Sequence, residues 1–338
     1  MEVFSGESFN VLKTRFKINP LSLDMKWLCI IFVALNMAQT SYSDSLKVMF
    51  WNLENFFDWR NDSTSVSDAE FSSIGAKHWT RKRFYAKCNA VAKGILWAGV
   101  PDVIGLAEIE NAFVLRRLLD ATALRKLDYR IVHFDSPDPR GIDVALLFRS
   151  SRLQLLTASP CHIYNKDSTV MATRDILMVL FRTAEGRDIA IFVNHHPSKY
   201  GGAAVSGPRR QRAVGRLKEL ADSLQNIGIT QILAMGDMND TPENPVYRQL
   251  EPTFRNLADS LYRKREGTIK FDGEWELIDL FFATPQIQTG HMNIIQIPFL
   301  MTQDVAHTGT KPLRTYSGPR YIGGVSDHCP IWITLILK

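Results

Sequence analysis

Acidic, amide and imidazole side chains recur after, within or just before short apolar segments in this 338-residue sequence. Such groups can bind a cation or move a proton. Any one of them has an ordinary structural explanation, because Asp and Asn often end strands and a lone His is usually structural. Six occurrences are more informative, since strand ends converge on one rim of a layered sheet and can meet in one cleft. They are Asn52 with Glu54, Glu108, Asn194–His196, Asp237–Asp240, Asp279, and Asp327 with His328.

The types of these side chains favour a hard divalent cation. Carboxylate and amide oxygens are ligands that suit Mg²⁺, Mn²⁺ or Ca²⁺. The sequence has no HExxH motif, and its cysteines, Cys29, Cys88, Cys161 and Cys329, are widely spaced without a CxxC pair. This argues against a structural zinc site and against a disulfide scaffold. Cys88 and Cys329 lie in apolar segments, so we expect both in the core.

The composition limits the class of protein. Hydrophobic residues make up 45% of the chain and charged residues 22%, which is close to ordinary globular usage. This excludes a disordered chain, a collagen-like repeat and a coiled coil. The formal net charge of +5 is compatible with an anionic substrate, but it is too small to indicate a dedicated nucleic-acid binder.

The N-terminus has the pattern of an export signal. Residues 1–24 show no sustained period, whereas Met25 is followed by a lysine and an apolar run that ends near Leu35. A positive charge, a short apolar run and small residues after it are typical of a signal peptide, and a spanning helix needs ~20 apolar residues. We therefore interpret 1–24 as an upstream extension and 25–43 as a signal peptide. The mature chain, 44–338, is predicted to be secreted or periplasmic, with no stable membrane anchor.

Apolar periodicity predicts one sheet-rich, layered α/β domain, because no repeat or linker divides the mature chain. Thr80–Ala98 has helical spacing with Thr80 as the N-cap, and Val114–Leu119 marks a second helix. Pro208 is predicted to open a third helix, since proline suits the first helical position. The other predicted elements are loops at 59–76 and 299–326 and strands at 46–51, 103–107, 130–134, 142–148, 153–156, 176–181, 189–193, 231–235, 277–282 and 331–337.

Five short motifs follow one another in the sequence, namely Phe50–Asn55, Leu106–Glu108, Asn194–His195, Gly236–Asn239 and Ser326–Pro330. In this order they resemble the endonuclease/exonuclease/phosphatase superfamily, over about 46–338. Arg140–Ala145 and Thr173–Leu177 are similar to the DNase-like, secreted bacterial branch of that family. The resemblance implies a four-layer sandwich, in which two mixed β-sheets pack face to face and are flanked by helices.

The resemblance also implies a divalent-metal site. Glu108 would be the main metal ligand, with Asn52 beside it, and Asp327 would be another ligand or an outer partner. Mg²⁺ is the expected ion, with Mn²⁺ or Ca²⁺ as alternatives. A divalent ion neutralises the negative charge of a phosphodiester and can activate water for attack.

The remaining motif residues take catalytic roles by the same resemblance. Asp237 and Asn239 would position or deprotonate the attacking water and hold the phosphate or a second ion. His328 would contact the scissile phosphate, and Asp279 would orient its imidazole. His195 would protonate the leaving oxygen. An imidazole paired with a carboxylate contributes acid–base catalysis of typically about 10²–10⁴-fold.

Four further features could bind substrate. His196 stands where this branch often has an aromatic residue, so the choice between His195 and His196 stays open, with His195 favoured. Arg140 and Arg174 are candidate phosphate ligands, because guanidinium pairs with phosphate bidentately; a structural ion pair is the alternative for Arg174. The basic stretch Lys199–Arg212 is either a solvated helix face or a phosphate-binding patch.

These features together predict a secreted, metal-dependent hydrolase of phosphate esters. A nuclease acting on DNA or RNA is the first interpretation, because the basic stretch at 199–212 favours a polyanion. The alternatives are a phosphatase and a sphingomyelinase- or phospholipase C-like phosphodiesterase. A catalytically inactive binding module is disfavoured, because every expected site position carries a competent residue. We expect the protein to be a monomer.

Overall fold

The computed structural model describes residues 45–62, 65–199 and 201–337. The predicted upstream extension, 1–24, and the predicted signal peptide, 25–43, lie outside these described residues. Within the described ranges, no helix is both long and apolar enough to cross a membrane.

Seven strands form the first sheet: β1 (Ser45–Phe56), β2 (Val103–Ile109), β3 (Tyr129–His133), β4 (Asp143–Arg149), β13 (Gln288–Thr289), β14 (Asn293–Ile294) and β19 (Ile331–Ile336). Their order is β13-β19-β1-β2-β4-β3, and β14 also pairs with β19. Only β1 and β2 run parallel; the other pairs are antiparallel. The central strand β1 is almost entirely buried, which is why its middle, residues 48–51, reads as a continuous apolar run.

Six strands form the second sheet: β5 (Leu153–Cys161), β6 (Ile176–Thr183), β7 (Asp188–His195), β8 (Ile232–Asp237), β9 (Arg255–Asn256) and β12 (Asp279–Ala283). Their order is β5-β6-β7-β8-β12-β9. The parallel pair β7–β8 lies among antiparallel neighbours, so this sheet is mixed like the first.

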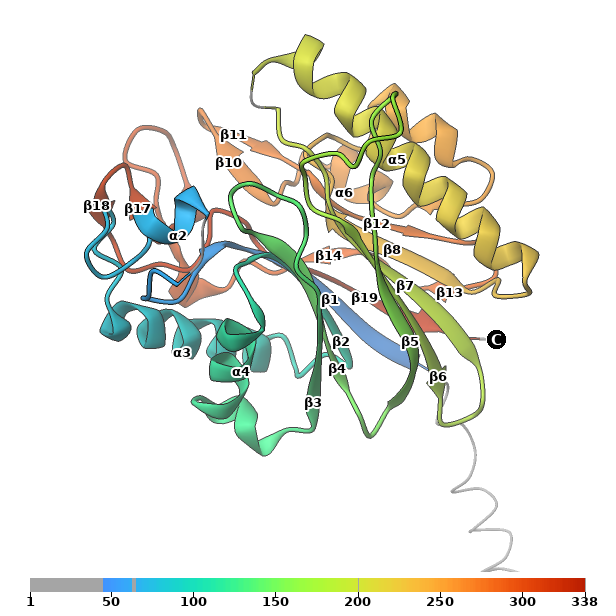
Figure 1. Ribbon diagram of the computed structural model, residues 1–338, viewed down its shortest axis with the longest axis horizontal. Helices are drawn as coiled ribbons and strands as arrows, with labels where there is room; N and C mark the ends of the chain where they lie inside the picture. Colours follow the sequence, from blue (N-terminus) through green and yellow to red (C-terminus); the bar gives the residue numbers. More distant parts are fainter. Residues whose placement is uncertain (1–44, 63–64, 200, 338) are drawn as a thin grey trace, which may run out of the picture. The chain divides into compact units, whose positions relative to one another are not determined.

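Helices cover the outer faces of both sheets. Helices α3 (Arg81–Trp97) and α4 (Ala112–Asp120) lie against the first sheet and α5 (Ala203–Asn226) against the second, as Figure 1 shows. The N-cap of α3 is Thr80, whose hydroxyl accepts a hydrogen bond from the Arg83 backbone N–H at 3.4 Å, as predicted.

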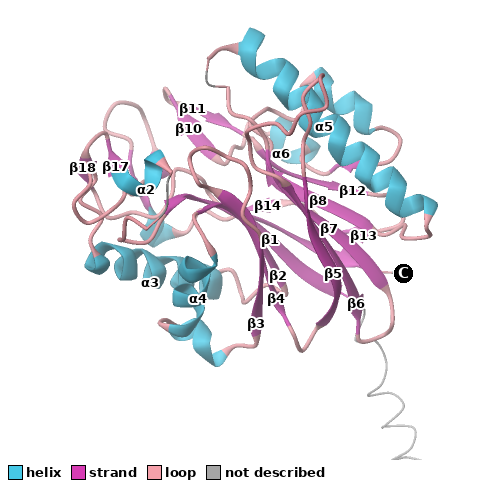
Figure 2. Cartoon of the chain, in the orientation of Figure 1, coloured by secondary structure: helices cyan, strands magenta, loops and turns pink. Residues whose placement is uncertain are grey.

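Two apolar clusters hold these layers together. Val48 and Phe50 of β1 belong to the cluster between the two sheets, which extends to the apolar face of α5. The alternate residues Met49 and Trp51 belong to the cluster under α3 and α4. This two-residue alternation is the pleat of a strand with both faces buried. The expected four-layer sandwich of two mixed sheets flanked by helices is confirmed (Figure 2).

The structure corrects the predicted start of the third helix. Helix α5 begins at Ala203, so Pro208 lies inside it and not at its first position. Proline has no N–H for the carbonyl four residues earlier, and the helix loses one hydrogen bond there. Burial of Val214 and Leu217 against the second sheet offsets this loss.

Both predicted loops contain short elements that periodicity could not reveal, because each is only two to five residues long. Helix α2 interrupts 59–76, and two hairpins interrupt 299–326. The short elements of the described chain are α2 (Val66–Glu70), η1 (Ala123–Lys126), η2 (Pro245–Leu250), α6 (Asp259–Arg263), β10 (Ile269–Phe271), β11 (Glu274–Glu276), η3 (Pro298–Leu300), β15 (Met301–Gln303), β16 (Thr310–Pro312), β17 (Tyr316–Ser317) and β18 (Arg320–Tyr321).

Candidate active site

The register of the second sheet places three of the predicted site residues side by side. His195 at the end of β7 pairs with Asp237 at the end of β8, and Asp237 pairs with Asp279 at the start of β12. Gly236 is required in this row, because a Cβ there would lie 2.2 Å from the carbonyl oxygen of Asn194. The predicted convergence of polar strand ends is therefore present in this sheet.

His328 reaches the same row from the loop that precedes β19. Its Nδ1 lies 2.8 Å from Oδ2 of Asp279, which turns Nε2 towards two other carboxylates. Nε2 is 3.8 Å from Oδ2 of Asp237 and 3.8 Å from Oδ1 of Asp327. The imidazole is thus held at one nitrogen and presented at the other, the arrangement expected of an acid–base or phosphate-contacting group.

The backbone around His328 is fixed to strand β1. The indole N–H of Trp51 donates to the His328 carbonyl at 2.9 Å. The Ser326 hydroxyl donates to the Asn52 carbonyl at 2.6 Å and accepts from the His328 backbone N–H at 2.9 Å. These bonds join the final strand of the chain to the first, so the imidazole is positioned by buried, rigid elements.

Asp237 is the centre of the cluster. Its Oδ2 accepts a hydrogen bond from the Asn52 side-chain amide at 3.0 Å and lies 3.6 Å from Nε2 of His195. Its Oδ1 accepts from the backbone N–H of Asn239 at 2.9 Å. Asn239 adopts the left-handed conformation, with φ of 52°, and its amide donates to the carbonyl of His196 at 2.9 Å. A non-glycine residue in this region is strained, and such strain often marks functional sites.

The two imidazoles beside Asp237 differ in charge. Burial alone would lower the pKa of His328, but the carboxylates of Asp279 and Asp237 outweigh it and raise that pKa well above its ordinary value. Burial, together with the positive charge of Arg174, lowers the pKa of His195 well below the ordinary value. Burial raises the pKa of Asp237 to about 7, although His328 opposes the shift. At neutral pH the site therefore holds a cationic His328 and a neutral His195.

Glu108 lies in a second group, next to the first. It follows the last regular pair of β1 and β2, at a register shift, and has φ of 60°. Its Oε2 accepts from the Asn55 backbone N–H at 2.7 Å, and its Oε1 is 3.5 Å from Nη2 of Arg140. Arg140 also donates to the Asn55 side chain at 2.8 Å. Among the described residues, Glu108 makes polar contacts with these groups and not directly with Asp237.

Three residues without an assigned role, Glu54, Lys87 and Arg314, lie beside the two groups. Nε of Arg314 lies 2.8 Å from Glu54 and its Nη2 lies 3.1 Å from Asp327. Lys87, on the buried face of α3, donates to the Glu54 carbonyl at 2.7 Å. Burial lowers the pKa of Lys87 to about 8, against the charges of Glu54, Glu108 and Asp327. Lys87 could have been noticed in the sequence, because it is a charged residue on an apolar helical face; Arg314 has no such signal.

The donor set fits a hard divalent ion. The predicted ligands Asn52 and Glu108 come from the neighbouring strands β1 and β2, and Asp327 precedes β19. Ligand atoms of Asp237, Asp279 and His328 also lie within 4.8 Å of one another, and the buried Oδ1 of Asp279 has no hydrogen-bond partner in the described part of the chain. Carboxylate and amide oxygens dominate both groups, as Mg²⁺ or Mn²⁺ would require.

Comparison with known proteins places this geometry in a family. Residues 47–337 match the model of the Endonuclease/Exonuclease/phosphatase family. The chain belongs to this family. No curated protein matches the sequence of the chain.

Solved structures share the fold of this endonuclease/exonuclease/phosphatase protein at low sequence identity. The human Nocturnin catalytic domain has a TM-score of 0.57 and 17% identity, covering 87% of this chain and 94% of that one. The mannosyl-6-phosphatase Bt3783 of Bacteroides thetaiotaomicron has a TM-score of 0.57 and 14% identity, covering 86% of this chain and 100% of that one. TDP2 of D. rerio, complexed with a single-strand DNA product, has a TM-score of 0.54 and 14% identity, covering 86% of this chain and 98% of that one.

Within this family member, Arg174 and His196 lie behind the site. Arg174 is buried and forms the structural ion pair, with Nη1 2.9 Å from Asp138, and it donates to the His196 carbonyl at 2.7 Å. The ring of His196 is buried and its nitrogens have no partner among the described residues, whereas His195 contacts Asp237. The geometry therefore brings His195, and not the His196 ring, to the reactive row.

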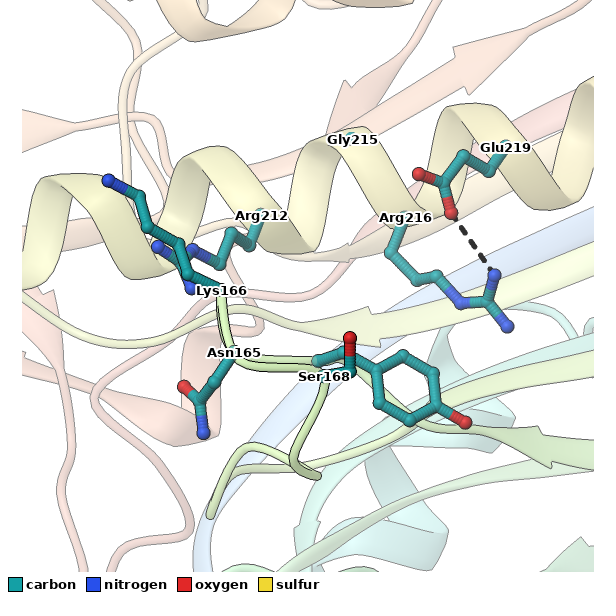
Figure 3. Close-up of a pocket in the computed structure, with 8 residues that line it drawn as sticks. Asn165, Lys166, Ser168, Arg212, Gly215, Arg216 and Glu219 are labelled. Atoms are coloured by element: carbon teal, nitrogen blue, oxygen red, sulfur yellow. Dashed lines mark hydrogen bonds and ion pairs between the residues drawn. The ribbon is translucent and has the colours of Figure 1, made fainter.

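Much of the basic stretch at 199–212 is engaged within the molecule. Lys199 pairs with Glu276 at 2.8 Å and Arg210 with Asp240 at 3.0 Å. Arg212 lines a pocket of about 530 Å³ between α5 and the loop after β5, beside an Arg216 that pairs with Glu219 (Figure 3). The pocket shares no lining residue with the candidate site. The interpretation of this stretch as a continuous phosphate-binding patch loses its support.

Proposed function

We propose that this protein hydrolyses phosphate esters by metal-assisted attack of water. The observation that carries the proposal is the row at the edge of the second sheet. There, Asp279 holds Nδ1 of His328 at 2.8 Å, and Nε2 of His328 and Nε2 of His195 lie 3.8 Å and 3.6 Å from the same oxygen of Asp237. A cationic donor, a neutral imidazole and a carboxylate with a pKa of about 7 are thereby placed around one point.

The side chains divide the chemistry among them. Asp237 accepts the proton of the attacking water, because burial keeps its pKa near neutrality. His328 contributes positive charge to the phosphate oxygens and a proton at Nε2. His195, neutral at pH 7, orients the reacting groups by hydrogen bonding. A divalent ion held by Glu108 and Asn52, with Asp327 as a further partner, would neutralise phosphate charge and lower the pKa of bound water.

Among phosphate esters, we propose nucleic-acid phosphodiesters as the first substrate class. Two guanidinium groups flank the site: the Arg140 side chain, 44% exposed, lies beside Glu108, and the Arg314 side chain, 54% exposed, lies beside Asp327. Exposed guanidinium groups beside a site can contact the phosphates of a polyanion. The DNA-bound structure of D. rerio TDP2 supports the same class.

A small phosphate monoester is the second candidate. A pocket of about 320 Å³ lies next to the site, lined by Glu54, Asn55, Lys77 and Arg314 among others. Two cationic side chains in so small a pocket suit a compact anionic group such as a sugar phosphate. The structural similarity to the Bacteroides thetaiotaomicron mannosyl-6-phosphatase supports this alternative.

The test is a substrate panel with the purified chain: plasmid DNA, RNA, sphingomyelin, inositol phosphates, mannose 6-phosphate and bis-p-nitrophenyl phosphate, each with Mg²⁺, with Mn²⁺ and after EDTA treatment. For a nuclease, Arg140→Ala raises the KM for DNA and lowers its salt dependence, and Lys77→Ala has little effect. For a monoesterase, Lys77→Ala raises the KM for the phosphate monoester and Arg140→Ala has little effect. Lys93→Ala, an exposed substitution on α3, is the matched control. If the protein hydrolyses none of these esters, the proposal is contradicted.

We further propose that the protein is exported as a monomer after removal of residues 1–43. The apolar run after Met25 supports export. N-terminal sequencing of the exported protein is expected to begin near Asp44, and recovery of Met1 contradicts the proposal. Light scattering of the purified protein measures its oligomeric state.

A further inference from the structure

A second group of carboxylates lies outside the candidate active site. Asp58, Asp62 and Asp68 belong to the segment that follows β1, and Glu110 follows β2; we call these four residues the β1–β2 acidic cluster. Ligand atoms of Asp62, Asp68 and Glu110 lie within 4.8 Å of one another. The two parts of the chain are already joined by the backbone bond from Glu110 N–H to the Phe56 carbonyl at 3.3 Å.

Two buried oxygens of this cluster lack a partner. Oε1 of Glu110 and Oδ2 of Asp58 have no hydrogen bond among the described residues, although the two residues are only 7% and 1% exposed. The other oxygen of each carboxylate is engaged: Glu110 Oε2 accepts from the Asp58 backbone N–H at 2.7 Å, and Asp58 Oδ1 accepts from the Arg60 N–H at 2.7 Å. Leaving a buried carboxylate oxygen unpaired is costly, so its position points to a ligand that is not part of the chain.

The electrostatic surroundings favour a cation as that ligand. The side chains of Asp58, Asp68 and Glu110 are all buried, so three carboxylates are gathered away from water. The Arg60 guanidinium approaches the cluster, but it lies 3.8 Å from Asp62 and stacks over Phe113 at 4.2 Å. The cluster therefore gathers four carboxylates beside a guanidinium that also stacks on an aromatic ring.

We propose that the β1–β2 acidic cluster is a Ca²⁺ site, separate from the catalytic residues, that fastens the segment after β1 to the end of β2. All the donors are carboxylate oxygens, which suit Ca²⁺ and exclude a thiolate-type zinc centre. Ca²⁺ accepts six to eight oxygens in a flexible geometry, which an irregular loop can provide more readily than the strict octahedron of Mg²⁺. The Asp62 side chain is 53% exposed, so the ion has access from solvent.

Occupation of this site would also support the substrate side of the cleft. Ser65, the N-cap of α2, packs against Gly141: a Cβ on Gly141 would lie 2.7 Å from the Ser65 side chain. Gly141 follows Arg140, which contacts Glu108. An ion held by Asp68 and Glu110 therefore fixes the loop that packs on the Arg140 turn.

The experiment measures thermal unfolding of the full chain after EDTA treatment and dialysis, with no ion, with CaCl₂ and with MgCl₂. At a Ca²⁺ concentration of about 100 Kd, we expect Tm to rise by roughly 5–10 °C, and by less than half as much with Mg²⁺. Glu110→Gln and the exposed Asp62→Asn are expected to lose most of the Ca²⁺ shift. Glu219→Gln, an exposed carboxylate on α5, is the matched control and keeps it.

Two comparisons separate this site from its alternatives. Glu108→Gln keeps the Ca²⁺ shift if the ion binds the β1–β2 acidic cluster, and loses it if the ion binds only at the proposed catalytic metal site. In EDTA, Glu110→Gln is expected to have a Tm equal to or above that of the unsubstituted protein, because one repelling charge is removed. Three outcomes overturn the proposal. In the first, Glu110→Gln has a lower Tm in EDTA but keeps the full Ca²⁺ shift. In the others, the unsubstituted protein shows an equal shift with Mg²⁺ or no shift with Ca²⁺.

Discussion

Replacing Asp279 by Asn tests the central pair of the candidate site while keeping its shape. The carboxylate lies 2.8 Å from Nδ1 of His328, and it is the strongest of the carboxylate influences that hold the pKa of His328 above its ordinary value. Asn can still accept a hydrogen bond from Nδ1 but supplies no charge. The imidazolium is then less stable, and the protonated fraction of His328 at neutral pH falls.

The magnitude follows from the role of the imidazole. Loss of an acid–base imidazole costs on the order of 10²–10⁴ in rate, or about 3–5 kcal/mol in the activation free energy, and this is our expectation for His328→Ala. Asp279→Asn is expected to lower kcat by about 10–10³-fold, because the imidazole remains. The double variant should be little slower than His328→Ala alone, since groups that act as a unit are not additive.

The pH dependence of kcat shows in which direction the pKa of His328 moves in Asp279→Asn. The folded pKa of His328 is raised, so its proton is bound at low pH and lost as pH rises through that pKa. The alkaline limb of kcat should therefore move to lower pH in Asp279→Asn. The matched control is His162→Asn, because His162 forms a similar 2.9 Å pair with Asp175 away from the site. Unchanged kcat in folded His328→Ala, or equal losses in the control, would refute the role.

Three other predictions concern the metal, the sheet and a buried imidazole. Exhaustive EDTA treatment should abolish phosphate-ester hydrolysis and Mg²⁺ or Mn²⁺ should restore it; undiminished activity in EDTA contradicts the ligand assignment. Gly236→Ala should sharply lower the Tm, because a Cβ would lie 2.2 Å from the Asn194 carbonyl. His196→Phe should make the protein less sensitive to acid unfolding. Burial lowers the pKa of His196 to about 3, so between that value and 6.5 the unfolded chain binds a proton that the folded chain does not. In this range the free energy of unfolding decreases as the pH is lowered, by up to about 1.4 kcal/mol per pH unit. Chemical denaturation at pH 5 and pH 7 measures the difference, and equal pH slopes in the two proteins would remove His196 as its source.

The sheets and the reactive row could be predicted from the sequence, because both depend on local patterns. Alternating or continuous apolar runs mark the strands, and polar residues directly after them must lie at strand ends. This placed His195 and Asp237 at one edge before any pairing was known, whereas Asp279 lay inside the predicted strand 277–282 and joins them because β12 begins at this residue. Their register, which brings them into direct opposition, is a property of the assembled sheet.

The links between distant charges could not be predicted. Arg314 lies in a Gly- and Thr-rich segment without periodicity, and it contacts Glu54 across 260 positions of the chain. The basic stretch shows the same limit in the opposite direction. The sequence displays the charges of Lys199 and Arg210, but their partners Glu276 and Asp240 belong to segments that only the fold brings close.

The assignment of charge to the two site histidines is the clearest case of the fold deciding chemistry. Both imidazoles approach the same oxygen of Asp237, at 3.6 Å and 3.8 Å, so that carboxylate alone cannot distinguish them. The difference arises at the other nitrogen. Nδ1 of His328 lies against Asp279, whereas Nδ1 of His195 is buried with no partner among the residues that the structure describes, and its ring lies in the field of Arg174. Because β12 pairs with β8 and not with β7, Asp279 serves only one of the two rings, and strand order thereby determines which histidine is the cation.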